Sequence, residues 1–312
     1  MRILILGAGG VGGYFGGRLA EAGRDVTFLV RPGRAEHLKR EGLVIRSVFG
    51  DAGLTVRTIL SGQVETSFDL VILSAKAYDM DSSLDAIAPA VGSQTAVLPL
   101  LNGFGHIETL IARFGEERVL GGTCFISSTL DASGTVLHLN DRHEVRFGEL
   151  RHGLSARVDA IAQLMRPAKM VSRASAGIVQ EMWEKWVMLA TLAGIMCLMR
   201  ASVGDIVAAP GGEAFTLQLL AECIAVAEAD GHAPRPEVLE PARQTLTAHG
   251  STFSASMLRD LERGGPTEAN HVIGGLIARA EHASIATPLL RIAWCHLNAS
   301  AHRRARAAAE AK

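Results

Sequence analysis

Short apolar runs alternate with helix-like segments through the first half of the chain. Residues 3–6, 69–75 and 96–101 are almost entirely apolar, which is typical of parallel strands that are covered on both faces. Segments with helical periodicity, such as residues 35–40 and 80–90, lie between these runs. This alternation predicts an α/β fold with a parallel sheet. Further short strands are expected at residues 43–48, 54–58, 119–127, 135–140 and 144–147, the last two antiparallel.

The pattern changes near residue 174, where strand-like runs give way to alanine-rich segments with helical periods. We therefore predict two domains, an α/β domain of residues 1–172 followed by an all-α domain of residues 173–312. The expected helices of the second domain are residues 177–200, 212–230, 235–248, 253–263 and 267–283.

The most specific motif is a glycine-rich turn directly after the first apolar run. It reads Gly7-Ala8-Gly9-Gly10-Val11-Gly12 and leads into a helix-like segment and a second apolar run. This G-x-G-x-x-G spacing between strand and helix is typical of a Rossmann-type dinucleotide-binding domain. Gly7 permits the tight turn, Gly9 lets the backbone approach a pyrophosphate, and Gly12 allows close helix packing. We expect the helix N-terminus to bind the phosphates; the alternative is a glycine-rich turn without a ligand.

The end of the second apolar run indicates which dinucleotide binds. NAD-selective sites place Asp or Glu about 20 residues past the glycines, where the carboxylate binds the ribose 2′-hydroxyl. Here Arg31 and Arg34 follow that run, and no carboxylate stands at its end. Because a guanidinium group matches a 2′-phosphate in charge and geometry, we expect NADP(H) as the cofactor, bound by Arg31. The alternative is that Arg31 is a solvated surface arginine.

Composition and charge argue against several other classes of protein. The 312-residue chain has a net charge of −1, so nothing favours nucleic acid or an anionic membrane as a partner. The N-terminal apolar run is too short for a signal peptide, and we expect a cytoplasmic protein. The longest charge-free stretch, residues 186–199, is too short to span a bilayer. Such a stretch is typical of a buried helix or a subunit interface, so a homodimer through the helical domain is one possibility.

The cysteines give no sign of a disulfide or metal framework. They are Cys124, Cys197, Cys223 and Cys295, which are far apart and form no C-x-x-C motif. We expect all four to be reduced and buried, as is usual in a cytosolic protein. No histidine pair has convincing metal-ligand spacing, so no metal is expected.

Two polar residues follow buried strands of the predicted sheet. Lys76 comes directly after the run 69–75, and Asn102 comes directly after the run 96–101. Ligands of open parallel sheets bind outside the carboxyl ends of the strands, so both residues are expected to face the cofactor and the substrate. The Asn102 amide can orient a substrate carbonyl or hydroxyl near the nicotinamide. The alternatives are an ordinary surface lysine and a simple turn asparagine.

Lys185 is the best candidate for a functional residue from the second domain. It stands at the start of the charge-free segment, in Glu181-Met182-Trp183-Glu184-Lys185-Trp186. A lysine beside apolar surface can have its pKa lowered toward neutral pH, which suits proton transfer. The alternative is a lysine that only extends its ammonium group into solvent from a helix boundary. Periodicity alone does not separate these two interpretations.

Taken together, these motifs resemble the ketopantoate reductase (2-dehydropantoate 2-reductase) family over nearly the whole chain. The order and spacing of the pieces are specific, although no single piece is. Besides the glycine turn and Arg31, the resemblance rests on Ser74-Ala75-Lys76, Leu101-Asn102-Gly103, Trp183-Glu184-Lys185, Ser256-Met257-Leu258-Arg259-Asp260-Leu261 and Pro266-Thr267-Glu268.

The resemblance implies an enzyme that reduces ketopantoate to pantoate with NADPH, in pantothenate biosynthesis. Lys185 would be the catalytic general acid, and Glu268 its carboxylate partner at the substrate hydroxyl. Asn102 would position the substrate, and Ser256 would contact the substrate carboxylate. Lys76 would lie beside the cofactor or the substrate. From the residues alone, Glu268 would be interpreted as a carboxylate at a helix start, where acidic side chains are favoured. Ser256 would be interpreted as an ordinary helix serine.

The chain departs from the family at several polar positions. Leu189 and Ala193 stand where the family usually has asparagines, one and two turns after Lys185. Ile273-Gly274 stands where the family usually has an asparagine–glycine pair. Apolar residues there would leave polar groups of ketopantoate under-satisfied, at roughly 1–3 kcal/mol each. One alternative is therefore a different, less polar 2-oxo acid or ketone as substrate. Another is a non-catalytic NADP(H) sensor, against which the retention of both Lys185 and Glu268 argues.

Overall fold

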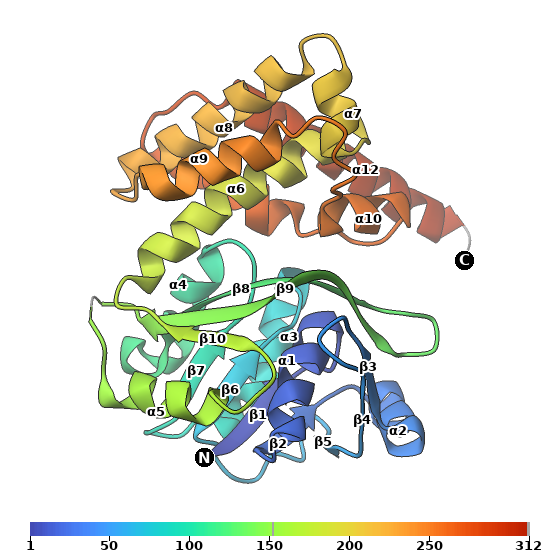
Figure 1. Ribbon diagram of the computed structural model, residues 1–312, viewed down its shortest axis with the longest axis vertical. Coiled ribbons are helices and arrows are strands. Elements are labelled where there is room, and N and C mark those ends of the chain that lie inside the picture. The colour runs from blue at the N-terminus through green and yellow to red at the C-terminus, as the bar shows by residue number, and fades with distance from the viewer. Residues whose placement is uncertain (152, 311–312) are drawn as a thin grey trace. The chain divides into compact units, whose positions relative to one another are not determined.

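The computed structural model describes residues 1–151 and 153–310, which form two compact units (Figure 1). The α/β unit comprises Met1–Leu101 and His106–Val179. The helical unit comprises the short turn Asn102–Gly105 and the chain from Gln180 onward. The turn that follows the last strand of the parallel sheet therefore belongs to the helical unit.

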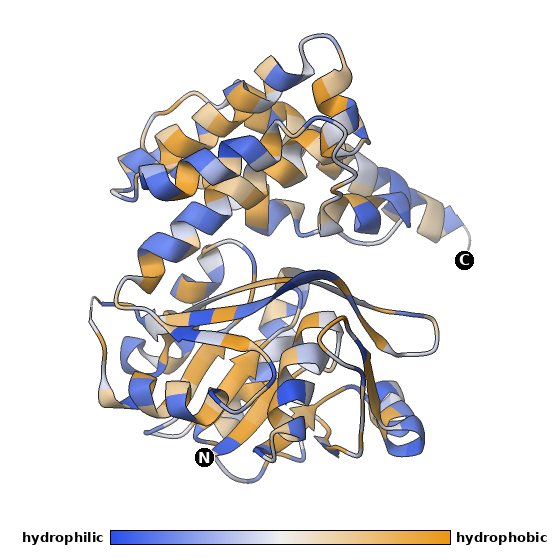
Figure 2. Ribbon diagram, in the orientation of Figure 1, coloured by the Kyte–Doolittle hydropathy of each residue, from blue (hydrophilic) through white to orange (hydrophobic). Residues whose placement is uncertain are grey.

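The main sheet of the α/β unit is entirely parallel, as the apolar runs predict. Its strand order is β5-β2-β1-β6-β7, and Ile3 of the central strand pairs with Val26 on one side and Leu70 on the other. Figure 2 shows the central strands of this sheet as hydrophobic. The strands are β1 (Arg2–Leu6), β2 (Asp25–Leu29), β5 (Arg57–Ile59), β6 (Leu70–Leu73) and β7 (Ala96–Pro99).

A second sheet completes this unit and differs in part from the predicted strands. Its order is β10-β9-β3-β4, with β8 antiparallel to β9. Residues 135–140 and 144–147 are not two strands but parts of one long strand, and residues 54–58 are divided between strands of two different sheets. The strands are β3 (Leu43–Arg46), β4 (Ala52–Leu54), β8 (Leu120–Leu130), β9 (Val136–Glu149) and β10 (Val171–Ala174).

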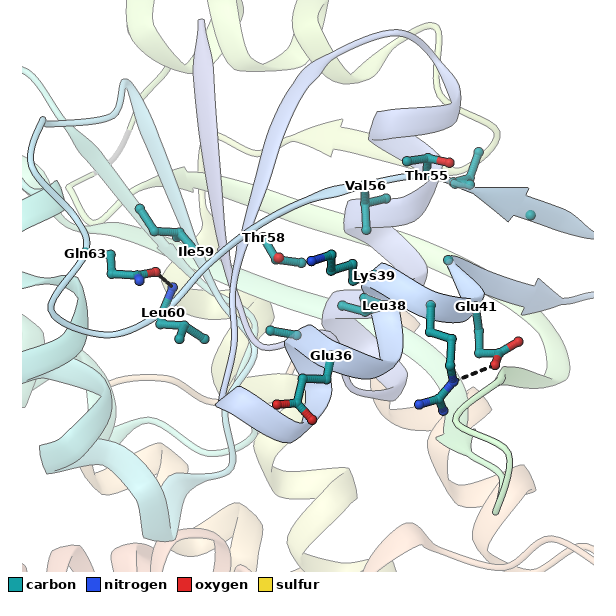
Figure 3. Close-up of a pocket in the computed structure, with 15 residues that line it drawn as sticks. Glu36, Leu38, Lys39, Glu41, Thr55, Val56, Thr58, Ile59, Leu60 and Gln63 are labelled. Atoms are coloured by element: carbon teal, nitrogen blue, oxygen red, sulfur yellow. Dashed lines mark hydrogen bonds and ion pairs between the residues drawn. The ribbon is translucent and has the colours of Figure 1, made fainter.

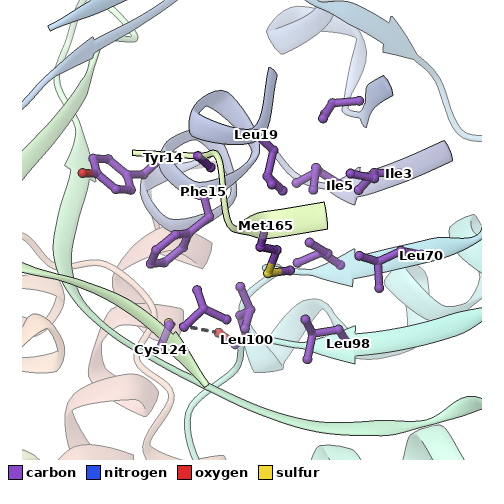
Figure 4. Close-up of a cluster of buried hydrophobic side chains, with 14 of the residues drawn as sticks. Ile3, Ile5, Tyr14, Phe15, Leu19, Leu70, Leu98, Leu100, Cys124 and Met165 are labelled. Carbon is purple, nitrogen blue, oxygen red and sulfur yellow. Dashed lines mark hydrogen bonds between the residues drawn. The ribbon is translucent and has the colours of Figure 1, made fainter. Parts of the chain in front are cut away.

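Helix α1 anchors the core of the α/β unit (Figure 4). Its side chains Tyr14, Phe15 and Leu19 are almost completely buried, and they belong to the same cluster as Ile3 and Ile5 of β1. Burial of such side chains stabilises the unit by about 1.5–3 kcal/mol each. The helices of this unit are α1 (Gly10–Glu21), α2 (Pro32–Glu41), α3 (Met80–Ile87), α4 (Gly105–Phe114), α5 (Ala156–Met165) and the short η1 (Ala77–Asp79), η2 (Ala88–Ala90) and η3 (Glu116–Arg118).

The helical unit confirms the change of pattern seen in the sequence. The segment 267–283, expected to be one helix, instead contains a π-helical turn before a shorter α-helix. Helices α7 and α12 were not predicted. The elements are α6 (Ile178–Met199), α7 (Val203–Ala208), α8 (Gly212–Ala229), α9 (Pro236–Leu246), α10 (Ser256–Glu262), η4 (Asn270–Gly274), α11 (Gly275–His282) and α12 (Pro288–Glu310).

Helix α6 is the apolar helix that the charge-free stretch predicts. Among the described residues it is the one helix long and apolar enough to cross a membrane by length and composition, but 72% of its apolar window is buried inside the protein. Cys197 lies on this helix and Cys223 on α8, and burial raises the pKa of each thiol to about 12. Cys124 is also buried. The expectation of buried cysteines is wrong for Cys295, which is exposed on α12.

Candidate functional site

The glycine turn joins β1 to α1 at the carboxyl end of the parallel sheet. Gly7 has φ +90°, a conformation that favours glycine, and its N–H donates to the Leu29 carbonyl at 2.9 Å. The first helical bond runs from the Gly13 N–H to the Gly9 carbonyl, and no side chain caps the helix start. The first turn of α1 also carries no acidic residue. Its N–H groups and positive dipole end are therefore suited to an anion.

Gly9 and Gly12 serve this turn in different ways. A Cβ on Gly12 would lie 2.1 Å from Ser74 Oγ and 2.3 Å from the Gly7 carbonyl oxygen, so only glycine fits there. A Cβ on Gly9 would have nothing within 4 Å. Packing of the protein itself therefore requires Gly12, whereas open space beside Gly9 leaves room for a ligand.

Ser74 holds the glycine turn against the neighbouring strand, a role that the sequence analysis missed. It follows β6, and its hydroxyl donates to the Leu6 carbonyl at 2.7 Å, at the end of β1. The serine was visible only as part of the Ser74-Ala75-Lys76 motif. Lys76, two residues further on, is half-buried and precedes η1.

Arg31 and Arg34 both lie at the start of α2, which begins three residues earlier than the predicted helix 35–40. The Arg31 side chain is 79% exposed, with its Nη2 3.0 Å from Asp79 Oδ2. Arg34 instead points at the glycine turn: its Nε donates to the Ala8 carbonyl at 3.1 Å and its Nη1 to the Gly134 carbonyl at 2.8 Å. Burial lowers the pKa of its guanidinium. Arg34 Nη2 is buried and has no hydrogen-bond partner among the described residues, so one cationic donor is left to bind something else.

An open groove of about 670 Å³ runs along α2 and the short strands β4 and β5 (Figure 3). Leu38, Val56, Ile59 and Leu60 contribute its apolar wall, and Lys39 lies among them. None of the predicted site residues lines this groove. We therefore do not place the functional site there.

In the helical unit, aromatic side chains hold the turn after β7. The Phe104 ring is stacked on Trp186, with ring centroids 6.3 Å apart, and lies 5.6 Å from Trp183. The Arg279 guanidinium is 5.3–5.6 Å from all three ring centroids. This packing fixes the position of the neighbouring Asn102 relative to α6.

Lys185 lies on α6 between the two tryptophans in sequence and is half-buried. One turn later Leu189 is also half-buried, so an apolar side chain occupies the same helix face. Ala193, a further turn along, is 1% exposed and belongs to the core. Of the two positions where the family usually has asparagines, Leu189 is therefore partly accessible beside Lys185, whereas Ala193 packs in the core.

Glu184, next to Lys185, has a structural role that the sequence did not reveal. Its two carboxylate oxygens accept from Arg235 Nε and Nη2, each at 2.7 Å, and Oε1 also accepts from the Arg235 backbone N–H at 3.1 Å and from Gln180. Burial raises the pKa of Glu184, but the bonds from Arg235 and Gln180 outweigh burial, so the pKa is lower than usual. This ion pair fastens the start of α9 to the part of α6 that carries Lys185.

Asn102 and Glu268 meet at a histidine that the sequence analysis did not single out. His271 lies against the turn: a Cβ on Gly103 would be 2.9 Å from His271 Cδ2, and the ring is hydrogen-bonded to the Asn102 backbone. The charge of Glu268, which is only 8% exposed, acts on the same ring. Burial lowers the pKa of His271, against the opposing effects of Glu268 and of the bond to Asn102. A π-helical turn carries His271, and such turns are frequent at functional sites.

Ser256, the remaining predicted site residue, lies on a different segment from Glu268. Its side chain is exposed on the first turn of α10. Across the described residues 1–151 and 153–310, no group of three or more His, Cys, Asp or Glu side chains could hold a metal ion.

Comparison with known proteins identifies relatives along the whole length of the chain. The family model "Ketopantoate reductase PanE/ApbA" matches residues 3–152, and its C-terminal counterpart matches residues 177–301. The chain is 38% identical over 297 residues to the uncharacterized oxidoreductase YkpB of Bacillus subtilis, covering 95% of this chain and 98% of the relative. It is 30% identical over 298 residues to a 2-dehydropantoate 2-reductase of Halobacterium salinarum, covering 93% and 96%. A crystal structure of 2-dehydropantoate 2-reductase from Geobacter metallireducens has a TM-score of 0.88 at 29% identity, covering 96% of this chain and 100% of that one.

Proposed function

Because the chain belongs to the ketopantoate reductase family of oxidoreductases, we propose that it reduces a 2-oxo acid to the 2-hydroxy acid with NADPH. 2-Dehydropantoate, whose reduction yields pantoate for pantothenate biosynthesis, is the first candidate substrate. One observation carries the proposal: Asn102 and Glu268, from distant parts of the chain, meet at His271 in the unit that contains Lys185. A protein that only sensed NADPH would need the glycine turn but not this polar cluster.

The glycine turn fits a dinucleotide. Gly9 faces open space, and the uncapped N–H groups of α1 are suited to a pyrophosphate. Arg31, at the start of α2, would pair with the 2′-phosphate that distinguishes NADPH from NADH. The buried donor Arg34 Nη2 adds positive charge beside the same turn. Lys76 at the end of β6 would lie beside the bound cofactor or the substrate.

The polar residues of the helical unit account for the proton chemistry. When bound, NADPH supplies a hydride to the C2 carbon of the oxo acid, and the C2 oxygen takes up the electron pair of the broken π bond. The Lys185 ammonium stabilises this oxygen and donates a proton to it, which completes the hydroxyl. Lys185 then regains a proton from water. Asn102 orients the carbonyl, Glu268 accepts a hydrogen bond from the new hydroxyl, and Ser256 contacts the substrate carboxylate.

A second candidate substrate is a less polar 2-oxo acid, which Leu189 favours. It is half-buried one turn after Lys185, where it offers apolar contact and no hydrogen bond. A branched or aromatic 2-oxo acid would keep the reacting group and replace the terminal hydroxyl of 2-dehydropantoate with apolar surface. Burying that hydroxyl without a partner would cost about 1–3 kcal/mol, or roughly 5- to 150-fold in kcat/KM.

A substrate panel tests both candidates. Purified protein is assayed for NADPH oxidation with 2-dehydropantoate, 2-oxo-3-methylbutanoate, phenylglyoxylate and pyruvate, and NADPH binding is measured in parallel by fluorescence titration. We expect kcat/KM to be highest for 2-dehydropantoate. A higher kcat/KM for the apolar acids would establish the second candidate instead. NADPH binding without turnover of any oxo acid would overturn both candidates in favour of a sensor.

A further inference from the structure

His271 occupies a central place in the helical unit but has no role in the chemistry derived above. It lies in η4, where the backbone N–H groups of His271 and Val272 both donate to the Glu268 carbonyl, at 3.1 and 2.9 Å. Its ring packs against Gly103 and is bonded to the backbone of Asn102. Because this bond raises the pKa, the ring N–H donates and the backbone carbonyl accepts. His271 thus connects two segments that each supply one of the proposed site residues.

Two indole groups hold η4 in place around His271. Trp186 Nε1, on α6, donates to the Val272 carbonyl at 2.7 Å, and Trp294 Nε1, on α12, donates to Asn270 Oδ1 at 2.9 Å. Trp186 is the residue directly after Lys185. The imidazole therefore sits on a turn that is fixed to the helix carrying the proposed proton donor.

We propose that His271 is a positioning residue for the reduction: its neutral imidazole holds the Asn102 turn in place and leaves the Glu268 carboxylate available to the substrate. This inference rests on the proposed function. On protonation, the imidazolium becomes a charged partner for Glu268 and competes with the substrate hydroxyl for the carboxylate. Activity is therefore expected to fall as the pH falls through the pKa of His271.

The surroundings of His271 make this dependence specific. The turn residues Asn102, Gly103, Phe104 and Gly105 carry no titratable group. The carboxylate of Glu268, on the same segment, acts on the imidazole, and α12 meets η4 through the neutral Trp294. The other ionisable side chains nearby are His106, directly after the turn, Lys185, directly before Trp186, and Arg279, whose guanidinium lies over the rings of Phe104 and Trp186. The E268Q variant therefore isolates the contribution of Glu268 from that of these groups.

An NMR titration tests the geometry without relying on any reaction. The imidazole signals of His271, assigned with H271Q, are followed with pH in the wild type and in E268Q, with exposed His282 as the internal reference. We expect a wild-type pKa below 6.5, because burial lowers it, and a lower pKa in E268Q, because the carboxylate that opposes burial is removed. An unchanged His271 pKa in E268Q would overturn the proposed coupling to Glu268.

Kinetics with the best oxo acid of the panel tests the positioning role. H271F keeps an aromatic ring but cannot donate, and we expect kcat/KM to fall about tenfold because the Asn102 carbonyl loses its partner. H271N and H271Q offer an amide donor at the two ring-nitrogen positions, and we expect one of them to restore most of kcat/KM while flattening the acidic limb of the pH profile. H282Q is the control.

The outcomes separate this inference from the proposed function. Wild-type kcat/KM in all three His271 variants, or an unchanged acidic limb in the active amide variant, would overturn the positioning role. If the wild type reduces no oxo acid of the panel, the proposed function itself fails. The NMR titration then still decides whether His271 and Glu268 are coupled.

Discussion

The glycine turn and the His271 cluster are built on opposite principles. The turn is local: Gly7, Gly9 and Gly12 lie within six residues, and the turn presents backbone groups with almost no side chains. The cluster brings together Asn102 and Glu268 from distant segments at His271, and aromatic rings and buried hydrogen bonds hold the same segments against α6, the helix that carries Lys185. The proposed cofactor binding therefore depends on one short motif, whereas the proposed chemistry depends on tertiary packing.

The sharpest test of this division is the replacement of Lys185. We expect K185A to lower kcat by about 10²–10⁴-fold, the usual effect of losing a positioned proton donor. NADPH affinity should stay at the wild-type value, since the glycine turn is intact. Steady-state kinetics and fluorescence titration measure the two quantities. K39A, which removes an exposed lysine of α2, is the matched control; equal losses in K185A and K39A would contradict the proposed role.

The Glu184–Arg235 pair tests how far the helical unit depends on long-range contacts. R235A leaves the Glu184 carboxylate, whose side chain is 3% exposed, without its main partner, and we expect the unfolding free energy to fall by about 3–5 kcal/mol. The double variant E184Q/R235A should recover part of this loss, because no buried charge remains. Urea denaturation gives both values. A loss in R235A below about 1 kcal/mol would show that the pair acts as an ordinary surface ion pair.

The same pair predicts a dependence of stability on pH. The folded-state pKa of Glu184 is below the ordinary value of 4.5, so its contribution is complete above that value and is lost as the pH falls through the folded-state pKa. In E184Q we expect a flatter decline in unfolding free energy over this acidic range than in the wild type. Denaturation curves of both proteins at several pH values provide the measurement. The same dependence of unfolding free energy on pH in wild type and E184Q would contradict this prediction.

The sequence predicts best what depends on local pattern. The apolar run 69–75 contains β6, and residues 177–200 contain α6, because full burial leaves a clear hydrophobic signature. Residues 54–58 were misread because their partners lie elsewhere: β4 pairs with β3, whereas β5 pairs with β2 in the other sheet. Strand pairing of this kind depends on contacts that a short window of sequence does not contain.

The residues of the candidate site that depend on contacts between distant segments could not be predicted from the sequence either. Spacing predicted the glycine motif and Arg31, and the charge-free segment indicated Lys185 as a candidate, whereas Glu268 came only from the resemblance to a family. His271 follows Glu268 by three residues in sequence, but its significance comes from the turn at Asn102 and Gly103, which only the fold brings to it. The partnership between Glu184 and Arg235 was hidden for the same reason.

Substitutions at Gly9 and Gly12 separate the structural role of the glycine turn from its proposed role in cofactor binding. G12A places a methyl group against Ser74 and the Gly7 carbonyl, and we expect a loss of about 1–3 kcal/mol in unfolding free energy from overpacking. G9A meets open space and should leave stability unchanged, but the methyl group should lower NADPH affinity by hindering approach of the pyrophosphate. G53A, which also meets open space but lies in β4, is the control for both measurements. Unchanged NADPH affinity in G9A would contradict a pyrophosphate at this turn.

The smallest effect is expected for Arg31, because its side chain is largely exposed and already paired with Asp79. R31Q should weaken NADPH binding by about tenfold, the lower range for a charge-assisted hydrogen bond, and should leave NADH binding nearly unchanged. R40Q removes another exposed arginine of α2, one that is paired with Glu41, and serves as the control. If R31Q lowers the affinities for NADPH and NADH equally, Arg31 contacts a group that both cofactors share. The proposed preference for NADPH then loses its support. A selective loss of NADPH binding would instead assign discrimination between the cofactors to a single exposed side chain beside the glycine turn.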